Sequence, residues 1–195
     1  MHGLTSIVTD DKSQRYADLL AAACGLVAGE PDPIANMANI AALIWQYLPD
    51  LNWAGFYRLV DGALILGPFQ GKPACLRIAL GAGVCGTAAA TRETQRIPDV
   101  TAFPGHIACD AASASELVVP IVHEGRLIGV LDLDSPCIGR FDAVDAAGLE
   151  ALVAAIAPAL TGERLTGLDG YTDPVVSSGM GKGSARTWPP FDPAI

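Results

Sequence analysis

Apolar side chains recur at helical spacing in three stretches of the chain. Two of these stretches lie near the N-terminus, at residues 11–28 and directly after Pro33, and they predict two helices. The third covers residues 149–156 and follows Asp142, a residue type that caps the N-termini of helices. The pattern therefore predicts two N-terminal helices and one C-terminal helix.

The middle of the chain instead shows short apolar runs separated by turn signals. In chain order, the predicted elements are a strand at 53–60, a turn at Asp61-Gly62, a strand at 63–66, a loop with one short strand and a Gly-rich turn, a short helix at 83–92, a strand at 95–100, a long loop, a strand at 116–122, a turn at Glu124-Gly125 and a strand at 127–133. We therefore predict an α+β (α/β) fold with a mostly antiparallel central β-sheet flanked by N- and C-terminal α-helices.

One domain is expected, because 195 residues suffice for an ordinary domain with an extension. We assign residues 1–161 to this domain. Residues 162–195 contain six Gly and four Pro with little periodicity, which predicts a flexible C-terminal tail.

Composition and charge narrow the possible partners. No apolar run is long enough to span a membrane, and the N-terminus lacks a basic stretch followed by an apolar core, so we expect a cytoplasmic protein. The net charge of -9 repels phosphate groups, which argues against nucleic acid and anionic membranes. A small molecule or a protein partner is the expectation.

The chain has five cysteines, Cys24, Cys75, Cys85, Cys109 and Cys137. An odd number without an export signal argues against a permanent disulfide framework. No CxxC or CxxH pair occurs, so we predict no metal site. The only zinc site compatible with this sequence would be one whose ligands are distant from one another along the chain. Cys24 falls on an apolar helix, where we expect it to pack, and Cys137 falls in a loop.

Cys109 lies in a long loop of Ala, Gly, Ser and Asp residues, where a ligand could reach its sulfur. For a single cysteine the alternative is a small buried residue. Glu116 lies seven residues after Cys109, at the start of a strand. Two further cysteines assigned to loops, Cys75 and Cys85, precede Cys109 in the sequence. Either cysteine could resolve an oxidised Cys109 if the fold brings the Cα atoms within ~7 Å.

Acidic and aromatic pairs give further candidates. In the run LDLDS, alternation places Asp132 and Asp134 on one face of a strand. If this face is buried, the pKa of one of the two carboxyl groups would be raised, and the pair could act as an acid catalyst or bind an ammonium group. If both carboxylates are instead solvated at the end of the strand, neither role is expected. Trp53 and Tyr57 also share a face, and could line a small pocket or pack in the core.

The segments NWAGFY, GPFQGKPAC, GAGVCGTAAAT, FPGHIACDAASASELVVPI and GVLDLDS occur in this order. Together they resemble the GAF-domain family of free methionine-(R)-sulfoxide reductases, over about residues 15–160. The resemblance implies a GAF-like fold and a thiol-dependent oxidoreductase that repairs oxidised methionine.

The resemblance also implies roles for individual residues. Cys109 would be the nucleophile, Cys75 its principal resolving partner and Cys85 a second redox cysteine. The substrate-binding residues that it implies are Glu116, Asp132, Asp134, Trp53 and Tyr57, with Ile107 and Ala108 beside the nucleophile. No bound cofactor is implied, and thioredoxin, or dithiothreitol in vitro, would supply electrons.

The chemistry fits these residue types. A thiolate attacks a sulfoxide sulfur readily only when an acid protonates the departing oxygen, so a nucleophile and an acid are needed together. Cys109 would attack, and a protonated carboxyl group of Glu116, Asp132 or Asp134 would be the catalytic acid. The product methionine leaves a sulfenic acid, which a second cysteine converts to a disulfide. Carboxylates could pair with the ammonium of a free amino acid, and loop N–H groups could hold its carboxylate.

Two other functions use the same residues. A GAF sensor module would bind a small molecule without converting it, since a fold does not fix a function. A cysteine-based redox switch or peroxidase would use Cys109 and a resolving cysteine, but would leave the acids unexplained. The amphipathic terminal helices could form a homodimer.

Overall fold

The computed structural model describes residues 11–105 and 111–162. Its helices are α1 (Lys12–Val27), α2 (Pro33–Tyr47), α3 (Gly83–Thr91) and α4 (Ala143–Ile156), with two short 3-10 helices, η1 (Val100–Ala102) and η2 (Ala157–Leu160). Its strands are β1 (Trp53–Val60), β2 (Ala63–Gly71), β3 (Arg77–Ala79), β4 (Gln95–Ile97), β5 (Ser115–His123) and β6 (Arg126–Ser135). The three long helices each begin at an aspartate whose carboxylate accepts hydrogen bonds from the first turn.

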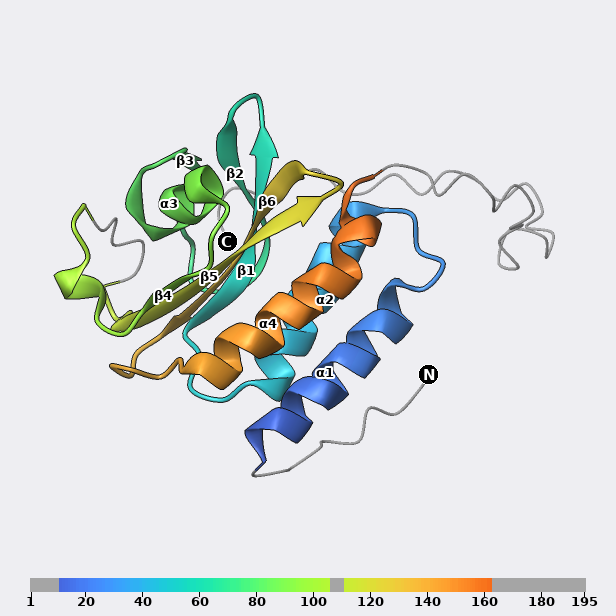
Figure 1. Ribbon diagram of the computed structural model, residues 1–195, viewed down its shortest axis with the longest axis horizontal. Coiled ribbons are helices and arrows are strands. Elements are labelled where there is room, and N and C mark those ends of the chain that lie inside the picture. The colour runs from blue at the N-terminus through green and yellow to red at the C-terminus, as the bar shows by residue number, and fades with distance from the viewer. Residues whose placement is uncertain (1–10, 106–110, 163–195) are drawn as a thin grey trace, which may run out of the picture. The chain divides into compact units, whose positions relative to one another are not determined.

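The strands form one antiparallel sheet in the order β3-β2-β1-β6-β5-β4. Two hairpins build most of it, with Asp61-Gly62 joining β1 to β2 and Glu124-Gly125 joining β5 to β6. All four turn residues have positive φ, as two-residue hairpin turns of this kind require. Because β1 pairs with β6, the two hairpins lie side by side in the sheet (Figure 1).

Helices α2 and α4 cover one face of the sheet, and α1 packs against both of them (Figure 1). Phe56, Leu117, Leu131 and Leu133 point from the strands into this layer and are fully buried. The segment Ala143–Leu160 is long and apolar enough to cross a membrane by length and composition alone. Its inward side chains belong to this core, as in the core helix of a globular domain.

A buried polar network around Asp145 joins α1 to α4. The Asp145 carboxylate accepts hydrogen bonds from the Tyr16 hydroxyl at 2.9 Å, the Lys12 ammonium at 2.8 Å and the Arg140 guanidinium at 3.0 Å. It also accepts from the backbone N–H of Asp142, which caps α4. Because the Asp145 side chain is fully buried, these donors offset the cost of removing its charge from water.

We expect Tyr16→Phe to lower the free energy of unfolding by about 1–3 kcal/mol, because it removes one donor from a buried, charged acceptor. Phenylalanine keeps the ring that packs against Gly148, where a Cβ would lie 2.3 Å from the Tyr16 ring. Urea denaturation followed by circular dichroism measures the loss. Tyr47→Phe, at a half-buried position on α2, is the matched control. Equal losses in both variants would contradict a role for the Tyr16 hydroxyl.

Helix α3 covers part of the opposite face (Figure 1). A second core cluster there combines Trp53, Tyr57, Val118 and Val130 of the sheet with Val84, Cys85, Ala88 and Ala89 of the helix. The helix can approach β3 closely because residue 86 is glycine. A Cβ on Gly86 would lie 2.3 Å from the carbonyl oxygen of Ala79. The candidate site residues occur on this face.

The predicted fold class is confirmed, with two corrections to the strands. β2 continues to Gly71, because a register shift in its pairing with β1 accommodates the turn-like pair Gly67-Pro68 within the strand. β4 ends at Ile97, since the following Pro98 has no N–H to donate to a ladder. The predicted tail falls almost entirely outside the described residues, so the division of the chain at residue 161 stays a prediction.

Candidate active site

The three candidate acids lie together on the α3 face of the sheet. Asp132 and Asp134 alternate with the core residues Leu131 and Leu133 along β6, and therefore share the face that was predicted. Glu116 on β5 is directly opposite Asp134 in the register, which places its side chain on the same face. Glu116 and Asp132 are 6% and 5% exposed, and Asp134 is half-buried. The alternative of a solvated strand end is therefore wrong for Asp132.

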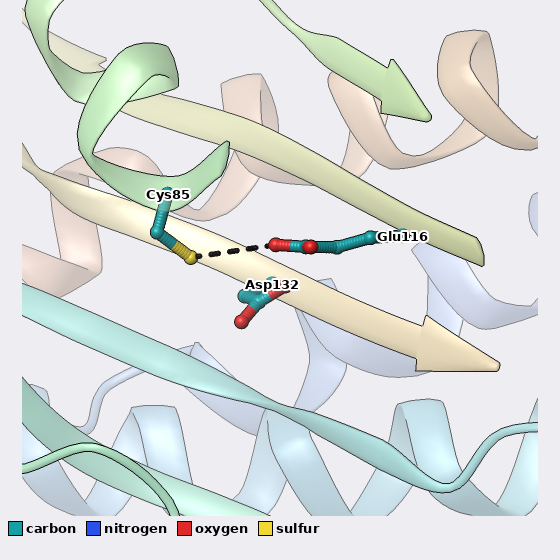
Figure 2. A group of neighbouring side chains, drawn as sticks. All are labelled: Cys85, Glu116 and Asp132. Atoms are coloured by element: carbon teal, nitrogen blue, oxygen red, sulfur yellow. Dashed lines mark hydrogen bonds between the residues drawn. The ribbon is translucent and has the colours of Figure 1, made fainter. Parts of the chain in front are cut away.

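Cys85 joins two of these acids from α3 (Figure 2). Its Sγ lies 3.9 Å from Oε1 of Glu116. The sulfur and one oxygen each of Glu116 and Asp132 all lie within 4.8 Å of one another. Cys85 is only 5% exposed and lies within α3, the helix predicted at 83–92, so its assignment to a loop is wrong. The three residues form a buried group that we call the Cys85 cluster.

Burial controls protonation in the Cys85 cluster. Burial, reinforced by the charge of Glu116, raises the pKa of Asp132 well above its usual range. Burial and the charge of Asp132 likewise raise the pKa of the Cys85 thiol and of the Tyr57 phenol. Oδ1 of Asp132 is buried and has no hydrogen-bond partner within residues 11–105 and 111–162. Asp132 is thus suited to keep a proton and to donate it.

Stacked aromatic rings stand beside the acids. The Trp53 ring centroid lies 5.7 Å from that of Tyr57 and 5.3 Å from that of Phe69. Gly55 is opposite Asp132 in the register, and a Cβ there would lie 2.3 Å from Phe69 Cβ and 2.8 Å from the Trp53 ring. Glycine at this position therefore permits the stack. Trp53 and Tyr57 share a face as predicted, and both are buried.

Phe69 and Gly55 were missed in the sequence. Phe69 stands in a segment assigned to a loop, because Gly67-Pro68 resembles a turn. The available signal was the aromatic residue itself, which directly follows that pair. Its place in the stack becomes evident only when the bulge is recognised and β2 is extended through it.

The residues predicted beside the substrate sulfur, Ile107, Ala108 and Cys109, lie outside the described residues. The flanks of their segment are fixed to the strand ends that carry the acids. The Ala114 N–H donates to the Ser135 carbonyl at 2.7 Å, and the Val100 N–H donates to the Ala114 carbonyl at 3.0 Å. Phe103 also packs against the second core cluster. Val100 and Ala114, one on each side of this segment, are therefore held at the end of β5 that carries Glu116.

The other cysteines differ in their surroundings. Cys75 is half-buried, packs against the second core cluster and is disulfide-bonded. Cys85, Cys24 and Cys137 are free, and the last two are exposed. The expectation that Cys24 packs in the apolar face of its helix is wrong, because it lies on the outer face of α1. Cys137 lies in the loop after β6, as predicted.

We expect Asp132→Asn to make stability less dependent on pH. The folded pKa of Asp132 is raised, so between the unfolded value of about 3.9 and the folded value the native state holds a proton that the unfolded chain has lost. The free energy of unfolding therefore falls as pH rises through this window. Asparagine does not titrate, so the variant should lose less stability from about pH 4 upward. Urea denaturation at several pH values measures this, and parallel profiles would contradict it.

Comparison with known proteins identifies the family of the chain. The chain matches the GAF domain family over residues 35–161. It is 56% identical over 144 residues to the free methionine-R-sulfoxide reductase of Escherichia coli, covering 74% of this chain and 87% of the relative. It is 47% identical over 150 residues to the free methionine-R-sulfoxide reductase of Saccharomyces cerevisiae, covering 73% and 83%.

A solved structure gives the same result. The free methionine-R-sulfoxide reductase of Neisseria meningitidis, in complex with its substrate, superposes with a TM-score of 0.80 at 42% identity. The match covers 84% of this chain and 98% of that chain. Sequence and fold thus agree, and the chain belongs to the GAF-domain family of free methionine-R-sulfoxide reductases, which are oxidoreductases.

Proposed function

We propose that this chain reduces free L-methionine-(R)-sulfoxide to L-methionine, with Cys109 as the nucleophile. The observation that carries the proposal is the pair of buried acids, Glu116 and Asp132, on the α3 face of the sheet. Val100 and Ala114, which flank the Cys109 segment, are hydrogen-bonded at the end of β5 that carries Glu116. The relative from Neisseria meningitidis, whose structure holds its substrate, supports the choice of substrate. The preference for the R epimer follows the same relatives.

The acids supply the proton that the reaction requires. As the Cys109 thiolate attacks, the S–O bond of the sulfoxide breaks and its oxygen must be protonated. Asp132, whose raised pKa favours the protonated form, is the donor best supported by its surroundings. The oxygen atom passes to Cys109 as a sulfenic acid, the two electrons pass to the substrate sulfur, and methionine leaves. The buried thiol of Cys85 has a raised pKa and is poorly suited to make the first attack.

A second cysteine returns the enzyme to its reduced state. The Cys75 thiol attacks the sulfenic sulfur of Cys109, which releases water and forms a disulfide. The position of Cys75 against the cluster that holds Cys85 supports its role and leaves Cys85 as a second redox cysteine. Thioredoxin, or dithiothreitol in vitro, would then reduce the disulfide. This cycle balances without a bound cofactor.

The acids also explain a preference for the free amino acid. A carboxylate that does not donate the proton, at Glu116 or Asp134, would pair with the substrate ammonium, while N–H groups at Ile107 and Ala108 would hold its carboxylate. The ring of Trp53 would pack against the thioether side chain. A peptide residue has no such ammonium and would therefore lose this charge-assisted ion pair.

The experiment that tests this proposal compares substrates. With dithiothreitol, we expect methionine to form from the free R sulfoxide. The free S epimer, the N-acetylated R sulfoxide and a peptide-bound sulfoxide should each react at least about a hundredfold more slowly. The last two lack the ammonium, and the S epimer would point its oxygen away from the acid when its ammonium and carboxylate are bound. Chromatography of the products measures the rates. Equal rates for the free and N-acetylated R sulfoxides would contradict ammonium recognition.

We further propose that the protein works in the cytoplasm, where a reducing environment suits its free cysteines. A homodimer formed through the terminal helices is also a proposal. Exposed Ile34 and Trp45 on α2 are consistent with it. Size-exclusion chromatography with light scattering would decide the oligomeric state.

A further inference from the structure

The Cys85 cluster has the composition of a metal site as well as that of an acid group. We propose that it binds a borderline-soft divalent cation such as Zn²⁺, with the Cys85 thiolate and one carboxylate oxygen each from Glu116 and Asp132 as ligands (Figure 2). The ligands come from α3 and from β5 and β6, the two strands of one hairpin. This is the zinc arrangement, assembled from distant residues, that the sequence left open.

The spacing of the ligand atoms fits such an ion. Zinc binds thiolate sulfur at about 2.3 Å and carboxylate oxygen at about 2.0–2.2 Å, so in a tetrahedral site sulfur and oxygen lie roughly 3.5 Å apart. The distance from Cys85 Sγ to Glu116 Oε1 is 3.9 Å, and all three ligand atoms lie within 4.8 Å. Small side-chain rotations would close the set. Three protein ligands leave a fourth position for water, as in catalytic zinc sites.

A second observation points to a ligand at this place. Oδ1 of Asp132 is buried and has no hydrogen-bond partner in the described part of the chain. A buried acceptor without a partner costs about 1–3 kcal/mol, and more when it is charged. In Figure 2 the Asp132 carboxyl group lies beside the Cys85–Glu116 pair. A cation between these residues would supply the missing partner.

The ion would compete with the reductase reaction. It would occupy both acids and keep Cys85 as a thiolate ligand, so the ion and a substrate ammonium could not be bound at the cluster together. Binding requires reduced Cys85 but no turnover. The metal site therefore stands or falls independently of the proposed reaction.

The test is a Cd²⁺ titration of the reduced full-length protein, followed by the ultraviolet thiolate-to-cadmium charge-transfer band, with Zn²⁺ as competitor. We expect one ion per chain. Cys85→Ser should remove the band. Glu116→Gln and Asp132→Asn should each weaken metal binding at least about tenfold, because the loss of a residue that only supports a metal ligand already lowers metal affinity by about that factor. The matched control is the double variant Cys24→Ser/Cys137→Ser, which removes exposed thiols and should bind as the wild type does.

A second double variant separates this site from the other cysteines. Cys75→Ser/Cys109→Ser keeps the Cys85 cluster and should keep the charge-transfer band. A band that survives in Cys85→Ser, or is lost in this double variant, would overturn the proposal. If near-ultraviolet circular dichroism shows that a carboxyl variant does not fold, X-ray absorption spectroscopy of the zinc-bound wild type still identifies the ligand atoms. One sulfur ligand among oxygen ligands supports the cluster, and two or more sulfur ligands overturn it.

Discussion

Replacing Cys109 with serine is expected to abolish reduction of free methionine-(R)-sulfoxide, with a loss of at least about 10⁴-fold in turnover. A serine hydroxyl stays protonated near neutral pH and cannot take up the oxygen atom and give two electrons to the substrate sulfur, as a cysteine thiolate does when it becomes a sulfenic acid. The assay measures methionine formed with dithiothreitol as reductant. Substrate binding, measured by calorimetry, should persist in the variant.

Cys137→Ser is the matched control for this result. Cys137 is free and exposed in the loop after β6, so its removal should change turnover by less than about twofold. If Cys109→Ser keeps its activity while Cys85→Ser loses it, the buried Cys85 is the nucleophile. The assignment of Cys109 would then be wrong.

Asp132→Asn is expected to lower turnover by about 10²–10⁴-fold, the usual contribution of a positioned general acid. The side chain is buried, its pKa is raised by burial and by Glu116, and its Oδ1 lacks a protein partner among the described residues. Asparagine keeps the size of the side chain but cannot protonate the sulfoxide oxygen. The variant should therefore fold, its free energy of unfolding should depend less on pH, and its turnover should be slow.

The matched control for Asp132→Asn is Asp61→Asn, at the exposed turn between β1 and β2, where asparagine also tolerates the positive φ of 49°. It should be fully active. Oxidation of Cys109 by hydrogen peroxide should be similar in wild type and Asp132→Asn, because peroxide needs no acid from the cluster. Unchanged sulfoxide reduction in Asp132→Asn would contradict the acid assignment and favour the peroxidase or redox-switch function, which does not use the acids.

Local signals were sufficient to predict much of the fold. Asp61-Gly62 and Glu124-Gly125 identify both hairpins, because two-residue turns with positive φ restrict the residue types. Asp142 marks the start of α4, where it forms a capping box with Asp145. The sequence predicts that β2 ends at residue 66, because a Gly-Pro pair is typical of turns. Only the pairing with β1 shows that a β-bulge accommodates this pair within a longer strand. Such tertiary effects have no local signature.

The arrangement of the candidate site can be predicted only in part from local sequence patterns. Alternation alone places Asp132 and Asp134 on one face of β6. Neither spacing nor composition indicates that Glu116 and Cys85 lie beside Asp132, because the strand order places β6 between β1 and β5 and helix α3 packs across them. The resemblance to a family supplied that grouping. The electrostatic consequence, a buried thiol and a carboxyl group with raised pKa values, required the structure.

The decisive measurement is a single turnover without external reductant. Fully reduced protein is mixed with excess free L-methionine-(R)-sulfoxide, and methionine and remaining thiols are counted. A reductase that uses Cys109 and a resolving cysteine should form one methionine and one disulfide per chain, with Cys109 in the disulfide by peptide mapping. Binding of the sulfoxide with all five thiols intact and no methionine formed would contradict the reductase and leave a sensor.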